Sequence, residues 1–160
     1  GVVPGAILYQ IIAESGITNL AWKDELVAHA FPVFILSAFS GLRLAKFNLD
    51  TRQTDSFIGL NTPSCTIFIL GIGLAWDQNT LGLRPFLGQT WVIYAIAGLF
   101  SYLLNSEIPM YSLKLKKGRL PLIFGVIGVS AVMLFLLKGL GLSVLIAGYI
   151  VSSILFFRKK

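Results

Sequence analysis

The chain is poor in the side chains that most catalytic and metal sites use. Its 160 residues include one cysteine, Cys65, and one histidine, His29. A single cysteine excludes an internal disulfide and a cysteine-based metal cluster. Charged residues make up 12% of the chain, whereas soluble domains usually carry about 25%. The composition therefore argues against an ordinary soluble domain.

Apolar residues, by contrast, make up 56% of the chain and gather into six runs. The runs are Val2–Ala13, His29–Ala45, Phe57–Trp76, Phe86–Leu104, Leu120–Leu137 and Leu140–Phe157. Most approach the length of about 20 residues that a helix needs to cross about 30 Å of hydrocarbon. We therefore predict an all-α fold, a polytopic transmembrane bundle of about six helices that forms one membrane domain over residues 1–160.

Positive charge is distributed unequally between the two ends of these helices. If the helices alternate in direction, ten of the 13 lysine and arginine residues fall on one side: Arg43, Lys46, Arg52, Lys114, Lys116, Lys117, Arg119, Arg158, Lys159 and Lys160. Such an excess marks the cytoplasmic side, so we expect an integral membrane protein with a cytoplasmic C-terminus. The net charge of +6 then indicates membrane lipids as partners, and no nucleic-acid partner is expected.

The densest polar cluster lies between the second and third runs. If the second run stays helical, Arg43 and Lys46 are neighbours on one face, and Asn48 and Arg52 follow just beyond. Arginine offers a planar fork to a phosphate or carboxylate and lysine a mobile charge, so the cluster predicts an anion site. The alternative is an anchor whose long side chains reach lipid headgroups. The residues alone leave both interpretations open.

Other features favour structural roles. His29 begins the second run, where a surface position is favoured over a ligand or catalytic role. Small residues recur at Ser37, Gly41 and Ala45, which favours ordinary helix packing and leaves a homodimer or substrate-groove face as the alternative. The last four runs have no charge near their middles, whereas ion-coupled transporters generally need one there.

Three motifs of the chain resemble a known family. They are Arg43-Leu44-Ala45-Lys46-Phe47-Asn48, Gly59-Leu60-Asn61-Thr62-Pro63 and Ser106-Glu107-Ile108-Pro109-Met110. In this order they are similar to the second half of the bacterial phosphatidylserine synthases of the CDP-alcohol phosphatidyltransferase family. The resemblance runs from Gly1 to about Lys117, and the last two runs are generic.

The resemblance implies a reaction, substrates and a cofactor. Such enzymes join CDP-diacylglycerol and L-serine to give phosphatidylserine and CMP, with aspartates holding Mn²⁺ or Mg²⁺, and we expect them in the bacterial inner membrane. By this resemblance, Arg43, Lys46 and Asn48 bind serine or a substrate phosphate. Arg52 and Thr62 are further candidates for the same substrate-binding site.

The chain departs from the family pattern in its aspartates. The family's metal motif begins Asp-Gly-x-x-Ala-Arg, but Asp24, Asp50, Asp55 and Asp77 are each followed by a residue other than glycine. We therefore expect the metal ligands upstream of Gly1, and a C-terminal fragment that has no catalytic or metal-binding residue and is inactive alone. A smaller departure is Asn61, which stands where we expect proline.

Two other functions remain open from the sequence. A related transferase could use another acceptor, such as glycerol phosphate or inositol phosphate, because only the acceptor pocket separates such enzymes. A non-enzymatic membrane scaffold or transporter would explain the missing aspartate pair. The uncharged middles of the runs argue against a transporter.

Overall fold

The protein folds as a bundle of helices, and its computed structural model describes residues 1–15, 30–49, 57–110, 132–133 and 135–158. The longer helices are α1 (Val2–Glu14), α3 (Ile35–Leu49), α4 (Thr62–Asp77), α6 (Thr90–Asn105) and α8 (Leu140–Arg158). Shorter elements are the 3-10 helices η1 (Phe31–Phe34) and η2 (Thr80–Gly82), the helix α5 (Arg84–Leu87) and the strands β1 (Phe57–Ile58) and β2 (Pro109–Met110). The described part of the chain is thus helical, apart from one pair of two-residue strands.

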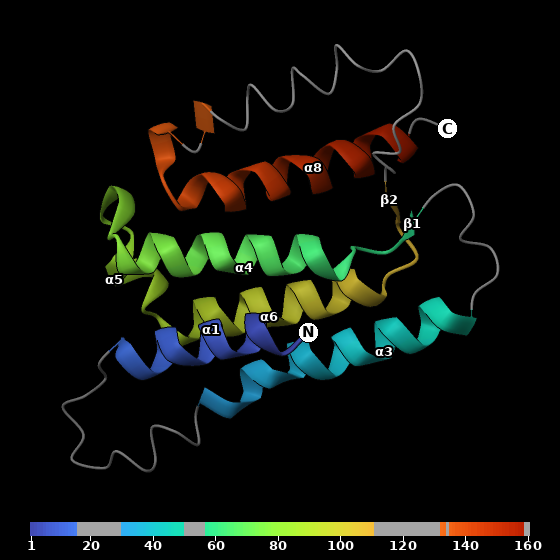
Figure 1. The fold of residues 1–160 in the computed structure, drawn as a ribbon, viewed down its shortest axis with the longest axis horizontal. Helices are drawn as coiled ribbons and strands as arrows, with labels where there is room; N and C mark the ends of the chain where they lie inside the picture. Colours follow the sequence, from blue (N-terminus) through green and yellow to red (C-terminus); the bar gives the residue numbers. More distant parts are fainter. Residues whose placement is uncertain (16–29, 50–56, 111–131, 134, 159–160) are drawn as a thin grey trace.

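The long helices lie side by side, with α1 and α4 running in one direction and α3, α6 and α8 in the opposite one (Figure 1). α4 contacts both α1 and α8, whereas α3 contacts α6 and α1. The C-terminal ends of α3, α6 and α8 therefore lie at the same end of the bundle as the start of α4, and β1 and β2 lie there too. We call this the strand end, and the opposite end, where α5 lies, the α5 end.

The core of the bundle is made of side chains from the facing sides of these helices. Leu8 on α1, Ile69 on α4 and Ile93 on α6 are completely buried. The rings of Phe68 and Phe100 join α4 to α6, with their centroids 4.4 Å apart. Full burial of one such side chain stabilises a fold by about 1.5–3 kcal/mol, so this core holds the two ends of the bundle in place.

None of the described helices is long and apolar enough to cross a membrane. The predicted polytopic transmembrane bundle is therefore wrong, and so is the predicted location as an integral protein of the bacterial inner membrane with a cytoplasmic C-terminus. The helices α3, α4 and α6 have 15, 16 and 16 residues, whereas the apolar runs that they overlap have 17, 20 and 19. At 1.5 Å per residue, 16 residues span only about 24 Å.

Local signals divide the apolar runs. Pro32 lies in the second run, which begins with the short η1. Gly59 has a left-handed backbone, and α4 begins only at Thr62. The fourth run is divided between α5 and α6, next to Gly88. The fifth run, Leu120–Leu137, and His29 lie largely or wholly outside the described residues.

The small residues of α3 have two different environments. Ser37 faces α1, where a Cβ added at Gly5 would lie 2.8 Å from the Ser37 Oγ. Gly41 and Ala45 are exposed, and nothing that the structure describes lies within 4 Å of a Cβ at Gly41. The interpretation as helix packing is confirmed for Ser37, and the homodimer stays a prediction.

Backbone hydrogen bonds join the connection between α3 and α4 to the end of α6 and the residues that follow it. β1 pairs antiparallel with β2. The N–H of Gly59 donates to the carbonyl oxygen of Ile108, and the N–H of Leu60 to that of Leu103, both over 2.9 Å. Gly59 has a φ of +76°, and a Cβ there would lie 2.8 Å from the carbonyl oxygen of Ser106. Only glycine fits this position without strain.

Candidate functional site

Arg43 lies on α3 and is half-buried at the strand end. Its Nη2 donates a hydrogen bond to the carbonyl oxygen of Gly59 over 3.3 Å. Its Nε–H is buried and meets no acceptor among the described residues. Burial lowers the pKa of the guanidinium, and nearby Tyr149 on α8 opposes this shift. Because a guanidinium stays charged at neutral pH, Arg43 offers a cationic donor that is not fully paired.

Lys46 follows Arg43 on α3 and binds the end of α6. Its Nζ donates to the carbonyl oxygen of Asn105 over 3.5 Å. The Asn105 side chain makes a second contact with α3, because its Nδ2 donates to the carbonyl oxygen of Phe39 over 2.9 Å. Asn105 therefore joins α3 to α6 and positions Lys46. The sequence analysis did not select Asn105, although it directly precedes the third motif at Ser106.

The start of α4 completes the strand-end cluster. Asn61 caps the helix, since its Oδ1 accepts a hydrogen bond from the N–H of Ser64 over 3.0 Å. Thr62 is the first helical residue, and its carbonyl oxygen accepts from the Thr66 hydroxyl. Asparagine is among the preferred N-cap residues, which explains its presence where the resemblance predicts proline. The positive end of the α4 dipole lies at this same end of the bundle.

The structure brings together only part of the predicted site. Arg43 binds the segment just before α4, and Lys46 binds the end of α6. Asn48 is exposed near the end of α3. Arg52 lies outside the described residues. The observed cluster therefore consists of Arg43 and Lys46, with Thr62 contributing the start of a helix.

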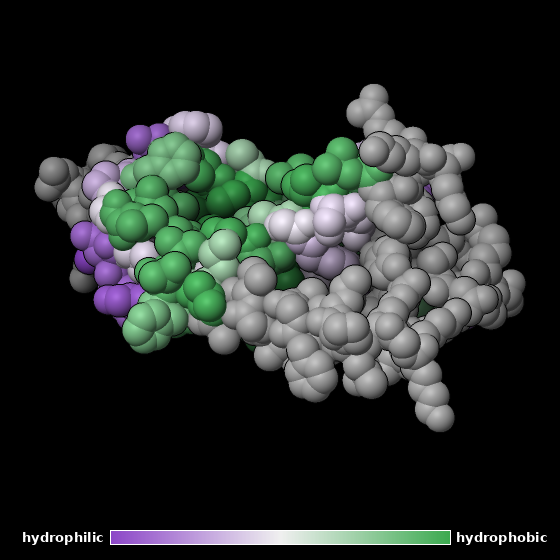
Figure 2. Space-filling model, turned by 90° about the horizontal axis from the view of Figure 1, so that it is seen from above, coloured by the Kyte–Doolittle hydropathy of each residue, from purple (hydrophilic) through white to green (hydrophobic). Residues whose placement is uncertain are grey.

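The two cations lie among exposed apolar side chains of the same helix. Leu42, Leu44, Phe47 and Leu49 are 51%, 62%, 42% and 83% exposed. On the opposite side of the molecule, seen from above in Figure 2, apolar residues also cover much of the described surface, and hydrophilic residues gather towards the α5 end on the left. The surface around Arg43 thus presents positive charge next to exposed apolar side chains. Such a surface is complementary to an anionic amphiphile.

The described residues do not fit a divalent metal. They contain no group of three or more histidine, cysteine, aspartate or glutamate side chains that could hold one. Cys65 is buried, and burial raises the pKa of its thiol to about 12. Since the thiolate is the form that binds metals and attacks substrates, Cys65 does neither at neutral pH.

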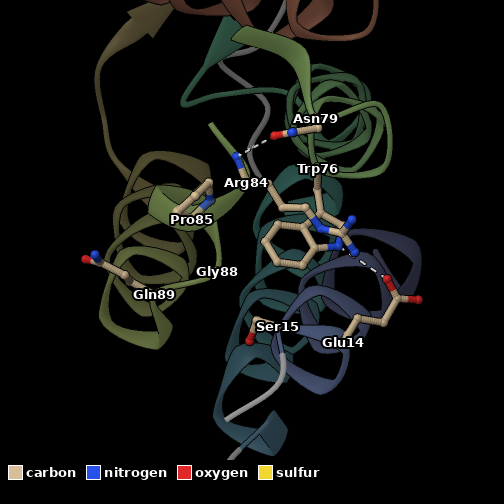
Figure 3. Close-up of a pocket in the computed structure, with 8 residues that line it drawn as sticks. All are labelled: Glu14, Ser15, Trp76, Asn79, Arg84, Pro85, Gly88 and Gln89. Carbon is tan, nitrogen blue, oxygen red and sulfur yellow. Dashed lines mark hydrogen bonds between the residues drawn. The ribbon is translucent and has the colours of Figure 1, made fainter. Parts of the chain in front are cut away.

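A second polar site lies at the α5 end, in an open cavity of about 440 Å³ (Figure 3). The Glu14 carboxylate accepts hydrogen bonds from Trp76 Nε1 over 3.2 Å and from Gln10 Nε2 over 2.8 Å. The guanidinium of Arg84 lies over the Trp76 ring, 4.9 Å from its centroid. Asn79 Oδ1 accepts from the Arg84 backbone N–H. The sequence analysis missed this site, because 62 residues separate Glu14 from Trp76.

Comparison with known proteins adds no assignment to either site. No protein-family model, curated protein or solved structure matches the chain. Function is therefore inferred from the geometry at Arg43 and Lys46 and from the three sequence motifs.

Proposed function

We propose that this chain supplies the substrate-phosphate site of a CDP-alcohol phosphatidyltransferase that transfers a phosphatidyl group from CDP-diacylglycerol to L-serine. The main supporting observation is the position of Arg43 and Lys46 on one helix, among exposed apolar side chains. The three motifs suggest the reaction, and the geometry supports the binding role.

CDP-diacylglycerol combines a diphosphate with two hydrocarbon chains, and the surface of α3 is complementary to both. In the proposal, Arg43 and Lys46 bind the diphosphate, while Leu42, Leu44 and Phe47 contact the hydrocarbon. A guanidinium can donate two parallel hydrogen bonds to a phosphate. The Nε–H of Arg43 is buried, so in the proposal the terminal N–H groups of the guanidinium donate to the phosphate.

The reaction needs positive charge near the transferred phosphorus. The serine hydroxyl oxygen forms a bond to the phosphorus that carries the lipid, and the bond from that phosphorus to the CMP oxygen breaks. CMP leaves with the electron pair, and the hydroxyl proton is released. Fixed donors that face this developing negative charge lower the barrier. The proposal assigns Arg43 and Lys46 binding and charge stabilisation, and no proton transfer.

The test is a CMP-release assay with CDP-diacylglycerol in detergent micelles and Mn²⁺ or Mg²⁺. Because we expect the metal ligands upstream of Gly1, the assay uses a protein whose coding sequence extends upstream, with the chain alone as the comparison. Release that depends on L-serine and is lost in the chain alone would support the proposal. Release with glycerol 3-phosphate or inositol phosphate would keep the family and change the acceptor. No release with any acceptor would overturn the proposal.

A further inference from the structure

The cavity at the α5 end contains two opposite charges that the proposed phosphatidyl transfer does not use. Glu14, at the end of α1, brings a carboxylate, and Arg84, at the start of α5, brings a guanidinium. Each oxygen of Glu14 accepts one hydrogen bond, which leaves it capacity for a further donor. Within the described part of the chain, no acceptor pairs with the N–H groups of the Arg84 guanidinium.

Trp76 holds these two charges in position. Its indole N–H donates to Glu14, and its ring face lies under the guanidinium of Arg84 (Figure 3). Trp76 is only 5% exposed, so the indole is a rigid part of the core rather than a mobile surface group. The carboxylate and the guanidinium therefore lie around one fixed ring, which gives the cavity an apolar floor between opposite charges.

The neighbouring amides leave donors available. Gln89 Oε1 accepts a hydrogen bond from Trp91 Nε1 over 2.7 Å, and Asn79 Oδ1 accepts from the Arg84 backbone. Both oxygens are thus engaged, while the amide nitrogens have no acceptor among the described residues. The cavity offers one acceptor of full negative charge together with several donors, in a volume of about 440 Å³.

We propose that this cavity binds a small zwitterion of the α-amino acid class. The ammonium group of the ligand binds the Glu14 carboxylate, and its carboxylate binds the Arg84 guanidinium. Hydrogen bonds between charged groups are roughly twice as strong as neutral ones, so both charges of the ligand are required. The proposal is independent of phosphatidyl transfer, because Arg43 and Lys46 bind Gly59 and the end of α6, at the other end of the bundle.

Equilibrium dialysis of the purified chain against radiolabelled L-alanine tests this site. L-alanine has no hydroxyl group, so it cannot act as an acceptor in the proposed transfer. We expect saturable binding, with L-lactate, which lacks the ammonium, and L-alaninamide, which lacks the carboxylate, each competing about tenfold or more weakly. Competition by either analogue as strong as that by L-alanine, or no binding by the folded protein, would overturn the proposal.

Single variants locate the ligand. Glu14→Gln and Arg84→Gln should each weaken binding of L-alanine about tenfold or more. Lys138→Gln is the matched control, since Lys138 precedes Gly139, whose N–H donates to Gln78 at the end of α4, and Lys138 does not line the cavity. Far-UV circular dichroism shows whether each variant is folded. Binding that survives in folded Glu14→Gln and Arg84→Gln, or that falls equally in Lys138→Gln, would contradict the assignment.

Discussion

Arg43 donates a hydrogen bond to the carbonyl oxygen of Gly59 over 3.3 Å, although the two residues are 16 positions apart. Gly59 in turn donates its N–H to Ile108, just before β2. The guanidinium is therefore hydrogen-bonded to the segment just before α4, and this segment is hydrogen-bonded in turn to the chain that follows α6. The position of Arg43 depends on a glycine whose backbone is left-handed.

Replacing Gly59 with alanine should destabilise the fold. A left-handed conformation costs a residue with a Cβ about 1–2 kcal/mol, and here the added Cβ would also lie 2.8 Å from the carbonyl oxygen of Ser106. Gly98→Ala is the control, because Gly98 lies inside α6 and a Cβ there meets nothing described within 4 Å. Urea denaturation should show a loss for Gly59→Ala and a gain of up to about 1 kcal/mol for Gly98→Ala. Equal stability of the two variants would contradict this account of Gly59.

The cap at Asn61 should contribute measurably to the stability of α4. Asn61→Ala removes the acceptor for the Ser64 N–H, and we expect a loss of about 1 kcal/mol in the free energy of unfolding. Asn61→Asp keeps an oxygen in the same place and should retain most of the stability. Thermal unfolding of the three proteins gives the comparison. A loss in Asn61→Asp as large as that in Asn61→Ala would show that the cap is not the cause.

The thiol of Cys65 should be unreactive in the folded protein. Burial raises its pKa to about 12, so almost none of it is thiolate at pH 8. Because Cys65 is the only cysteine of the chain, alkylation by iodoacetamide reports on this residue alone. We expect slow labelling in buffer and fast labelling in guanidinium chloride. Labelling at the same rate in both would mean that Cys65 is exposed.

Glu14 should make stability depend on pH in the acidic range. The hydrogen bond from Gln10 lowers the pKa of Glu14 most, followed by that from Trp76, and the charge of Arg84 adds to them. A carboxyl whose pKa is lowered by folding stabilises the protein above its ordinary pKa of about 4.3. This contribution is lost as the pH falls through the lower pKa of the folded state.

The difference in melting temperature between the wild type and Glu14→Gln tests this pH dependence. The wild type should be the more stable at pH 7, and the difference should shrink as the pH is lowered below about 4. The effect should be small, because Glu14 is exposed and solvent screens its charge. A difference that stays constant down to pH 3 would exclude Glu14 as its source.

Local patterns predicted the positions of the helices well. The first apolar run, Val2–Ala13, corresponds to α1 at Val2–Glu14, and the last, Leu140–Phe157, to α8 at Leu140–Arg158. In the middle runs the membrane prediction took the length of an apolar run as the length of a helix. Gly59 in the third run lies before the start of α4, and Gly88 in the fourth lies between α5 and α6, so the helices there are shorter than the runs.

The site was predictable only where neighbours in sequence are neighbours in space. Helical spacing placed Arg43 near Lys46, and both lie on α3. The contact of Lys46 with Asn105 spans 59 residues, and the contact of Glu14 with Trp76 spans 62. Such contacts depend on how the helices pack, which periodicity within one helix does not specify.

The central claim is that Arg43 binds the phosphate of the lipid substrate, and one comparison tests it most directly. The measurement is kcat/KM for serine-dependent CMP release by the upstream-extended protein, as wild type, Arg43→Gln and Lys138→Gln. Loss of a charge-assisted hydrogen bond predicts a fall of about tenfold to a hundredfold for Arg43→Gln, and no more than a small change for Lys138→Gln. Equal values for the wild type and a folded Arg43→Gln would contradict the account.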